Sequence, residues 1–187
     1  IIKFITLSGI DGAGKSTLVG LLSTLMRPTE GEIWLDGRPV DLDSPSLRAR
    51  VGYVGHQTML YGSLTARENL EFFAALYGVE DRARRVDEML ERVGLTDDAD
   101  RCIDEFSRGM AQRLAIARAL TPSPEVVLLD EPFTGLDQNG IELCIEMFLE
   151  IKARGAVLVL ISHDLSLVQR LADRIIILRR GRKVFEG

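Results

Sequence analysis

The segment GIDGAGKST, residues 9–17, decides how the rest of the sequence is interpreted. It has the P-loop pattern, in which two glycines separated by four residues precede a lysine and a hydroxyl residue. Glycines let backbone N–H groups turn inward around phosphate oxygens, and the following helix directs its positive end at the same place. We expect phosphate contacts from eight residues of the loop: Gly9, Asp11, Gly12, Ala13, Gly14, Lys15, Ser16 and Thr17.

The last residues of the P-loop pattern, Lys15 and Ser16, are expected to have different roles. Lys15 is expected to reach the β- and γ-phosphates of ATP, and Ser16 to be a ligand of Mg²⁺. The alternative is a glycine-rich turn without a ligand, but the loop lies between a predicted strand and a predicted helix, as the motif requires. A dinucleotide-binding fingerprint is disfavoured because Thr17 stands where its third glycine belongs.

The composition limits the classes of function. A chain of 187 residues with 46% hydrophobic and 27% charged residues is ordinary for one globular domain. The net charge of −5 disfavours a nucleic-acid-binding protein with a broad basic surface. Cys102 and Cys144 lack C-x-x-C spacing, and no apolar run approaches the roughly 20 residues that span a bilayer. A role at a membrane would therefore depend on a partner.

Outside the loop, strand and helix patterns alternate along the chain. Continuous apolar runs predict buried strands at residues 1–7, 126–129, 157–161 and 175–178, with a short strand at 51–54 and a hairpin at 32–40. Helical spacing predicts helices at residues 15–25, 107–120, 137–154 and 165–172. The alternation predicts an α/β fold, a P-loop NTPase with a mostly parallel sheet flanked by helices.

A helical stretch interrupts this alternation. Thr65 and Glu68 have the spacing of a capping box, and two helices ending at Gly78 and Gly94 follow. We predict a single domain with a core at residues 1–57 and 120–187 and an inserted helical subdomain at about 63–119.

Polar residues follow three of the predicted strands. Parallel strands end at one edge of a sheet, where α/β proteins bind ligands. Asp130 is expected to hold Mg²⁺, and Glu131 to orient or deprotonate the attacking water. His163 is expected to contact a γ-phosphate, and Gln57 to reach the Mg²⁺ or the water. The alternatives, two solvated acids and an ordinary loop histidine, are disfavoured beside a P-loop.

From about residue 18 onward the chain resembles the ABC-type ATPases, the nucleotide-binding domains of ABC transporters. Six elements occur in that family's order: a Walker A loop (9–17), a Q-loop glutamine (Gln57), a signature-like FSRGMAQR (106–113), a Walker B strand LLDEP (128–132), a D-loop TGLD (134–137) and a switch histidine (His163). The signature and the stretch DEPFTGLD are most similar to the CcmA-type haem-exporter ATPases of cytochrome c biogenesis.

The resemblance implies a head-to-tail homodimer with ATP between a P-loop and the partner's signature. Ser107 and Gly109 would bind the γ-phosphate of the partner's ATP, and Asp137 would cross the interface. Hydrolysis would move transmembrane subunits of an exporter at the inner face of the plasma membrane. The usual signature is LSGGQ; here Arg108 and Met110 replace its glycine and glutamine, whereas the serine and the second glycine remain.

The first 17 residues fit that family least. The two antiparallel strands that usually precede the P-loop strand, and the aromatic residue that stacks on adenine, are missing, and residues 3–17 resemble the start of a thymidylate kinase. Two explanations stay open: an N-terminally shortened ABC domain, or an engineered chain with a kinase-like opening, which we favour. We expect roughly tenfold weaker ATP binding without the aromatic residue, and an exposed or differently paired sheet edge near Trp34.

Two other functions remain as alternatives. A nucleoside monophosphate kinase is suggested by the opening residues alone, because the downstream residues match the signature, D-loop and switch histidine instead. An engineered or truncated P-loop protein that binds nucleotide or phosphate without transport is the second alternative.

Overall fold

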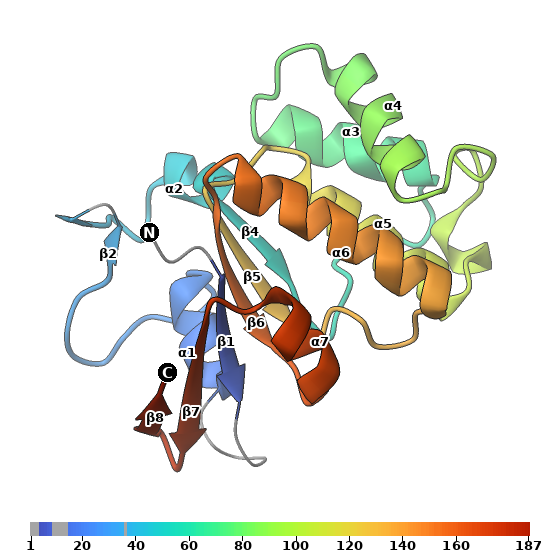
Figure 1. The fold of residues 1–187 in the computed structure, drawn as a ribbon. Helices are drawn as coiled ribbons and strands as arrows, with labels where there is room; N and C mark the ends of the chain where they lie inside the picture. Colours follow the sequence, from blue (N-terminus) through green and yellow to red (C-terminus); the bar gives the residue numbers. More distant parts are fainter. Residues whose placement is uncertain (1–3, 9–14, 36) are drawn as a thin grey trace.

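The computed structural model describes residues 4–8, 15–35 and 37–187, and its centre is a six-stranded sheet (Figure 1). The strand order is β4-β5-β6-β1-β7-β8. Four neighbouring pairs are parallel, and the last pair, β7 with β8, is antiparallel. The predicted α/β fold with a mostly parallel sheet is therefore confirmed. The strands are β1 (Phe4–Ser8), β4 (Val51–Val54), β5 (Val126–Asp130), β6 (Val157–Ile161), β7 (Arg174–Arg179) and β8 (Arg182–Glu186).

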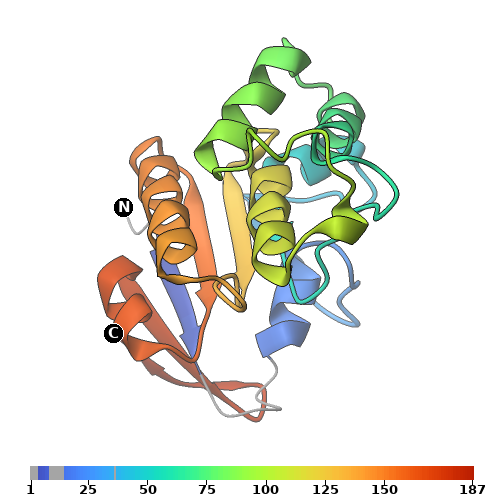
Figure 2. The same cartoon turned by 90° about the vertical axis from the view of Figure 1, so that its right-hand side faces the viewer.

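Both faces of β5 and β6 are buried, which explains the continuous apolar sequences of these two strands. On β5, Leu129 faces a large core with α5 and α6, whereas Leu128 faces a smaller core with Val19 of α1. Figure 2 shows α5 and α6 side by side over the sheet. The helices are α1 (Lys15–Leu22), α2 (Pro45–Arg50), α3 (Ala66–Leu76), α4 (Arg82–Arg92), α5 (Arg108–Leu120), α6 (Gln138–Ala153) and α7 (Leu165–Leu171), with a 3-10 turn at Ile103–Glu105.

The helices α3 and α4 pack on each other and on α5, at one end of the molecule (Figures 1 and 2). Their buried residues Leu70, Met89 and Leu90 join the same hydrophobic cluster as Leu129 of β5. The helical region therefore shares its core with the sheet through α5. Gly78 and Gly94, at φ 66° and 62°, adopt the left-handed conformation that ends a helix.

One local prediction needs correction, and two elements were not predicted. The helix expected at residues 15–25 ends at Leu22, because Thr24 has a φ of 64° and the Met26 N–H donates to the Gly20 carbonyl in a turn. The helix α2 and the strand β8 were not predicted. Both have weak sequence signals, since α2 has only six residues and β8 is mostly exposed.

The predicted hairpin near Trp34 is present as β2 (Trp34–Leu35) paired with β3 (Arg38–Pro39). Within the described residues it forms a separate two-stranded sheet and does not join the six-stranded one. The Trp34 side chain is 57% exposed. This matches the expectation of an exposed edge at this hairpin.

Replacing Thr65 with alanine is expected to destabilise the protein by about 1 kcal/mol, because Thr65 caps α3. Its hydroxyl accepts from the Glu68 N–H at 3.1 Å, and the Glu68 carboxylate accepts from the Thr65 N–H at 2.8 Å. Urea unfolding of Thr65→Ala measures the change. Thr96→Ala, at an exposed loop position, is the control; an equal loss in both variants would contradict the capping role.

Candidate functional site

The carboxyl ends of the parallel strands bring the predicted polar residues to one edge of the sheet. The register aligns Val54 with Leu129 and Asp130 with Ile161, so β4, β5 and β6 end side by side. Leu7 near the end of β1 also aligns with Ile161. The residues after these strands, including Gln57 and His163, therefore lie along the same edge.

The P-loop is described only in part. Lys15, Ser16 and Thr17 form the first residues of α1, which directly follows the loop in sequence. Gly9, Asp11, Gly12, Ala13 and Gly14 lie outside the described residues.

Asp130 is the last residue of β5 and is buried, with 4% of its surface exposed. Its Oδ2 lies 4.0 Å from Nε2 of His56, which is exposed beyond the end of β4 beside Gln57. Burial, and then the charge of Asp130, raise the pKa of the Tyr53 hydroxyl on β4. Sequence reasoning missed His56, although its position next to Gln57 after a strand was the signal that could have found it.

Glu131 has a backbone conformation that is uncommon for a residue with a side chain. Its φ is 52°, and its N–H donates to the Ile161 carbonyl at 3.0 Å. Non-glycine residues with left-handed backbones are often found at functional sites, where the surrounding structure holds them. The turn places Oε1 of Glu131 3.4 Å from Nε2 of His163. The structure therefore brings together two residues that are 32 positions apart in the sequence.

The signature segment is fixed to the loop that follows β5. Gln112 of α5 donates through Nε2 to the Pro132 carbonyl at 2.9 Å, in a buried position. A Cβ at Gly109 would lie 2.9 Å from the Gly135 carbonyl oxygen, so only glycine permits this approach without a shift of the backbone. The two segments are therefore held in direct contact within one chain.

Ser107 and Asp137 are both exposed helix caps. Ser107 begins α5, and its hydroxyl accepts from the Met110 N–H at 3.2 Å. Asp137 begins α6, and its Oδ1 accepts from the Gly140 N–H at 2.9 Å. Both caps place an exposed polar side chain at a helix N-terminus, where the negative charge of Asp137 is itself favoured.

The donor set at the sheet edge fits Mg²⁺. Magnesium takes oxygen ligands and is usually held by one or two carboxylates together with substrate phosphates. The buried Asp130 offers one such carboxylate, and the predicted ligands Ser16 and Gln57 would add oxygen atoms. Among the described residues there is no cluster of three or more acidic, histidine or cysteine side chains that could hold a metal ion alone.

A protein-family model described as "ABC transporter" matches residues 3–134. The chain is 35% identical over 182 residues to the "ABC transporter ATP-binding protein NatA" of Bacillus subtilis (strain 168), covering 96% of this chain and 74% of that protein. It is 39% identical over 181 residues to the "Daunorubicin resistance ATP-binding protein DrrA3" of Streptomyces coeruleorubidus, covering 96% of this chain and 57% of that one.

The fold also matches that of a solved ATP-binding cassette, described as a dimer in a post-hydrolysis state bound to ADP and Pi. The TM-score is 0.88 at 32% identity, with 99% of this chain and 84% of that chain covered. In the described part of the present structure, no helix has both the length and the apolar character needed to cross a membrane.

Proposed function

The chain belongs to the ABC transporter ATP-binding proteins, a family of ATPases, and we propose that it binds ATP with Mg²⁺ and hydrolyses it to drive a transporter. The observation that carries the proposal is the Glu131–His163 pair beside the buried Asp130, at the sheet edge where the P-loop helix begins. A carboxylate next to a histidine at this edge is suited to act on water beside a terminal phosphate.

In the proposed mechanism, each residue has one task. Lys15 binds the β- and γ-phosphates, and Asp130, Ser16 and Gln57 hold the metal ion. Bound Mg²⁺ would supply positive charge against the phosphate oxygens. Glu131 orients the attacking water and accepts its proton at the carboxylate. His163 keeps that carboxylate in position and contacts the γ-phosphate.

We propose that the active unit is a head-to-tail homodimer. The solved dimeric relative supports this, as do the exposed caps Ser107 and Asp137. In the dimer, Ser107 and Gly109 would bind the γ-phosphate of the partner's ATP, and Asp137 would contact the partner across the interface.

An exposed aromatic patch supports a further partner, the transmembrane subunits of an exporter. Tyr61, Phe72 and Leu76 are 48%, 43% and 62% exposed, and Tyr61 packs edge-on against Phe72 at 5.1 Å between ring centroids. The patch begins four residues after Gln57, so a subunit bound there would contact the metal site through a short segment. Such docking would place the chain at the inner face of the plasma membrane.

Haem export in cytochrome c biogenesis is our proposal for the cargo. It rests on the likeness of residues 106–113 and 130–137 to haem-exporter ATPases. Expression of this chain in a bacterium that lacks its haem-exporter ATPase should restore c-type cytochromes, measured by haem staining. Failure to restore them in a strain where the chain is shown to be expressed would argue against this cargo.

The test of the function is ATP turnover with and without a nucleoside monophosphate. An ABC-type ATPase should release phosphate from ATP alone, at a rate that the monophosphate leaves unchanged. Transfer to the monophosphate would instead support the kinase alternative. Nucleotide binding with no phosphate release would support a non-enzymatic P-loop protein.

Replacing Lys15 with alanine is expected to weaken ATP binding by roughly ten- to a hundredfold, because it deletes charge-assisted hydrogen bonds to the phosphates. Calorimetric titration of ATP with Mg²⁺ measures the change. Lys183→Ala, in the exposed strand β8, is the control for the loss of a lysine. Equal ATP affinity in Lys15→Ala and the unmodified chain would contradict the proposal that this loop binds the phosphates.

A further inference from the structure

A cavity lies at the edge of the sheet opposite the proposed ATP site. It is bounded by α4, α6 and the first residues of β5 and β6, Val126 and Val157, and has a volume of about 330 Å³. Ligand sites usually have volumes of roughly 300–1,000 Å³ and combine apolar walls with a few polar groups. We call this cavity the arginine pocket, because three guanidinium groups line it: those of Arg85, Arg92 and Arg154.

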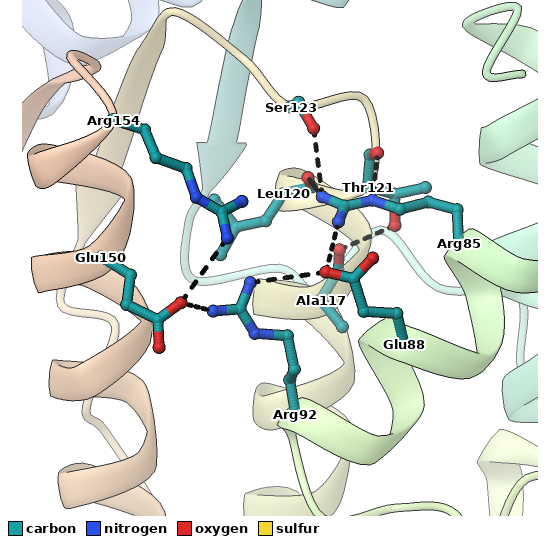
Figure 3. A network of polar contacts seen from close by, with 9 residues as sticks. All are labelled: Arg85, Glu88, Arg92, Ala117, Leu120, Thr121, Ser123, Glu150 and Arg154. Atoms are coloured by element: carbon teal, nitrogen blue, oxygen red, sulfur yellow. Dashed lines mark hydrogen bonds and ion pairs between the residues drawn. The ribbon is translucent and has the colours of Figure 1, made fainter.

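The three arginines belong to a chain of alternating charges, shown in Figure 3. Glu88 contacts Arg85 at 3.0 Å and Arg92 at 3.8 Å. Glu150 contacts Arg92 and, at 3.8 Å, Arg154. The chain begins and ends with an arginine, so three positive charges face two negative ones. One positive charge is left over.

Arg92 and Arg154 are the arginines of this network that can bind a further acceptor. The guanidinium of Arg85 is hydrogen-bonded to the end of α5, where it donates to the carbonyls of Thr121 and Leu120 at 3.0 and 2.8 Å. Arg92 and Arg154 share Oε2 of Glu150, and Arg92 also lies 3.8 Å from Oε1 of Glu88. A guanidinium has five N–H donors, so these contacts leave both residues with donors for another acceptor.

Burial increases the effect of this excess charge. The side chain of Arg92 is only 17% exposed, whereas that of Arg154 is 62% exposed. Desolvation, followed by the charge of Arg154, lowers the pKa of Arg92. Arginine stays protonated in proteins, so the shift reports an environment in which positive charge is under-compensated. An anion bound in the pocket would compensate this positive charge.

The remaining walls determine what kind of anion fits. Leu35, Val126 and Ile151 line the pocket with apolar surface. The acidic Glu125 also lines it, but its carboxylate is bound by Arg50 through two hydrogen bonds of 2.8 and 2.6 Å. A single excess positive charge beside apolar walls suits a singly charged anion with an apolar body better than a multiply charged phosphate, which loses more hydration on burial.

We propose that the arginine pocket binds a small organic carboxylate, with its carboxylate on Arg92 and Arg154 and its apolar body against Leu35, Val126 and Ile151. The pocket lies at the start of the strands, and the ATP site lies at their end. It is therefore a separate ligand site, and the proposal does not depend on ATP hydrolysis.

Octanoate is the probe for this site, and NMR titration is the measurement. Saturable shifts of backbone amide signals in residues 125–126 and 151–156 are expected. Octanol lacks the charge and inorganic phosphate lacks the apolar body, so both should bind more weakly than octanoate. Tighter binding of phosphate than of octanoate would overturn the assigned ligand class. Absence of saturable octanoate binding at these residues would overturn the site.

Two substitutions should change the octanoate affinity in opposite directions. Arg154→Gln removes the excess charge and should weaken binding about tenfold, whereas Glu150→Gln frees donors and should strengthen binding several-fold. Arg84→Gln, on the exposed side of α4, is the matched control and should leave binding unchanged. If the arginines only hold the helices together, the substitutions should change stability without these opposite changes in octanoate affinity. Equal octanoate affinity in the unmodified chain and the three variants would overturn the proposal.

Discussion

Glu131→Gln is expected to lower ATP hydrolysis by roughly a hundred- to ten-thousandfold, the contribution typical of a general base. Glutamine keeps the size and most hydrogen bonds of glutamate but cannot accept the proton of the attacking water. The backbone turn at φ 52° and the bond from the Glu131 N–H to Ile161 do not depend on the side-chain charge, so the fold should persist. ATP binding should also persist, and a dimer with trapped ATP should accumulate.

The measurements are phosphate release, calorimetry with ATP and Mg²⁺, and size-exclusion chromatography with ATP. Glu146→Gln, an exposed acid on α6, is the control for the loss of a negative charge. Hydrolysis in Glu131→Gln at the rate of the control would show that another group handles the proton. His163 would then be the next residue to replace, because it lies 3.4 Å from Glu131.

The second large effect is expected for stability. Phe148→Ala should destabilise the protein by about 3–5 kcal/mol, because Phe148 is fully buried and its removal leaves a cavity in the large core. Its ring packs edge-on against Phe133 at 5.9 Å between centroids. Phe133 lies two residues after Glu131, so the substitution should also lower hydrolysis by loosening that loop.

Urea unfolding gives the stability change, and Leu149→Ala is the matched control on the same helix. Leu149 is 42% exposed, so its truncation should cost much less than that of Phe148. Similar losses in the two variants would contradict the place of Phe148 in the core. If Phe148→Ala does not fold, Phe148→Leu, with a smaller expected loss, provides the same comparison.

The parts of the fold with strong local signals could be predicted from the sequence. The strand β6 has the predicted bounds, and the capping box at Thr65 is present as expected. These features depend on neighbouring residues, which a sequence displays directly. The end of α1, the helix α2 and the strand β8 depend on weak or tertiary signals and were misjudged or missed.

The candidate functional site likewise has parts that could be predicted from local sequence and parts that could not. Residues at or just beyond the ends of apolar strands, such as Asp130 and His163, could be placed at one sheet edge because parallel strands fix that geometry. The 3.4 Å approach of Glu131 to His163 depends on a backbone conformation that no sequence pattern indicates. The roles of the site residues stay predictions, which the substitutions of Lys15 and Glu131 test. The division into core and helical subdomain also stays a prediction.

The left-handed backbone at Glu131 lowers the stability of the fold at a residue that is proposed to be needed for hydrolysis. A residue with a side chain at φ 52° costs of order 1–3 kcal/mol, which glycine would largely avoid. Selection for heat resistance alone would therefore favour replacing Glu131, whereas its proposed role in hydrolysis would favour keeping it. Laboratory evolution for heat resistance should accordingly yield its most stable variants with Glu131 replaced. Those variants should fold more stably and hydrolyse ATP less.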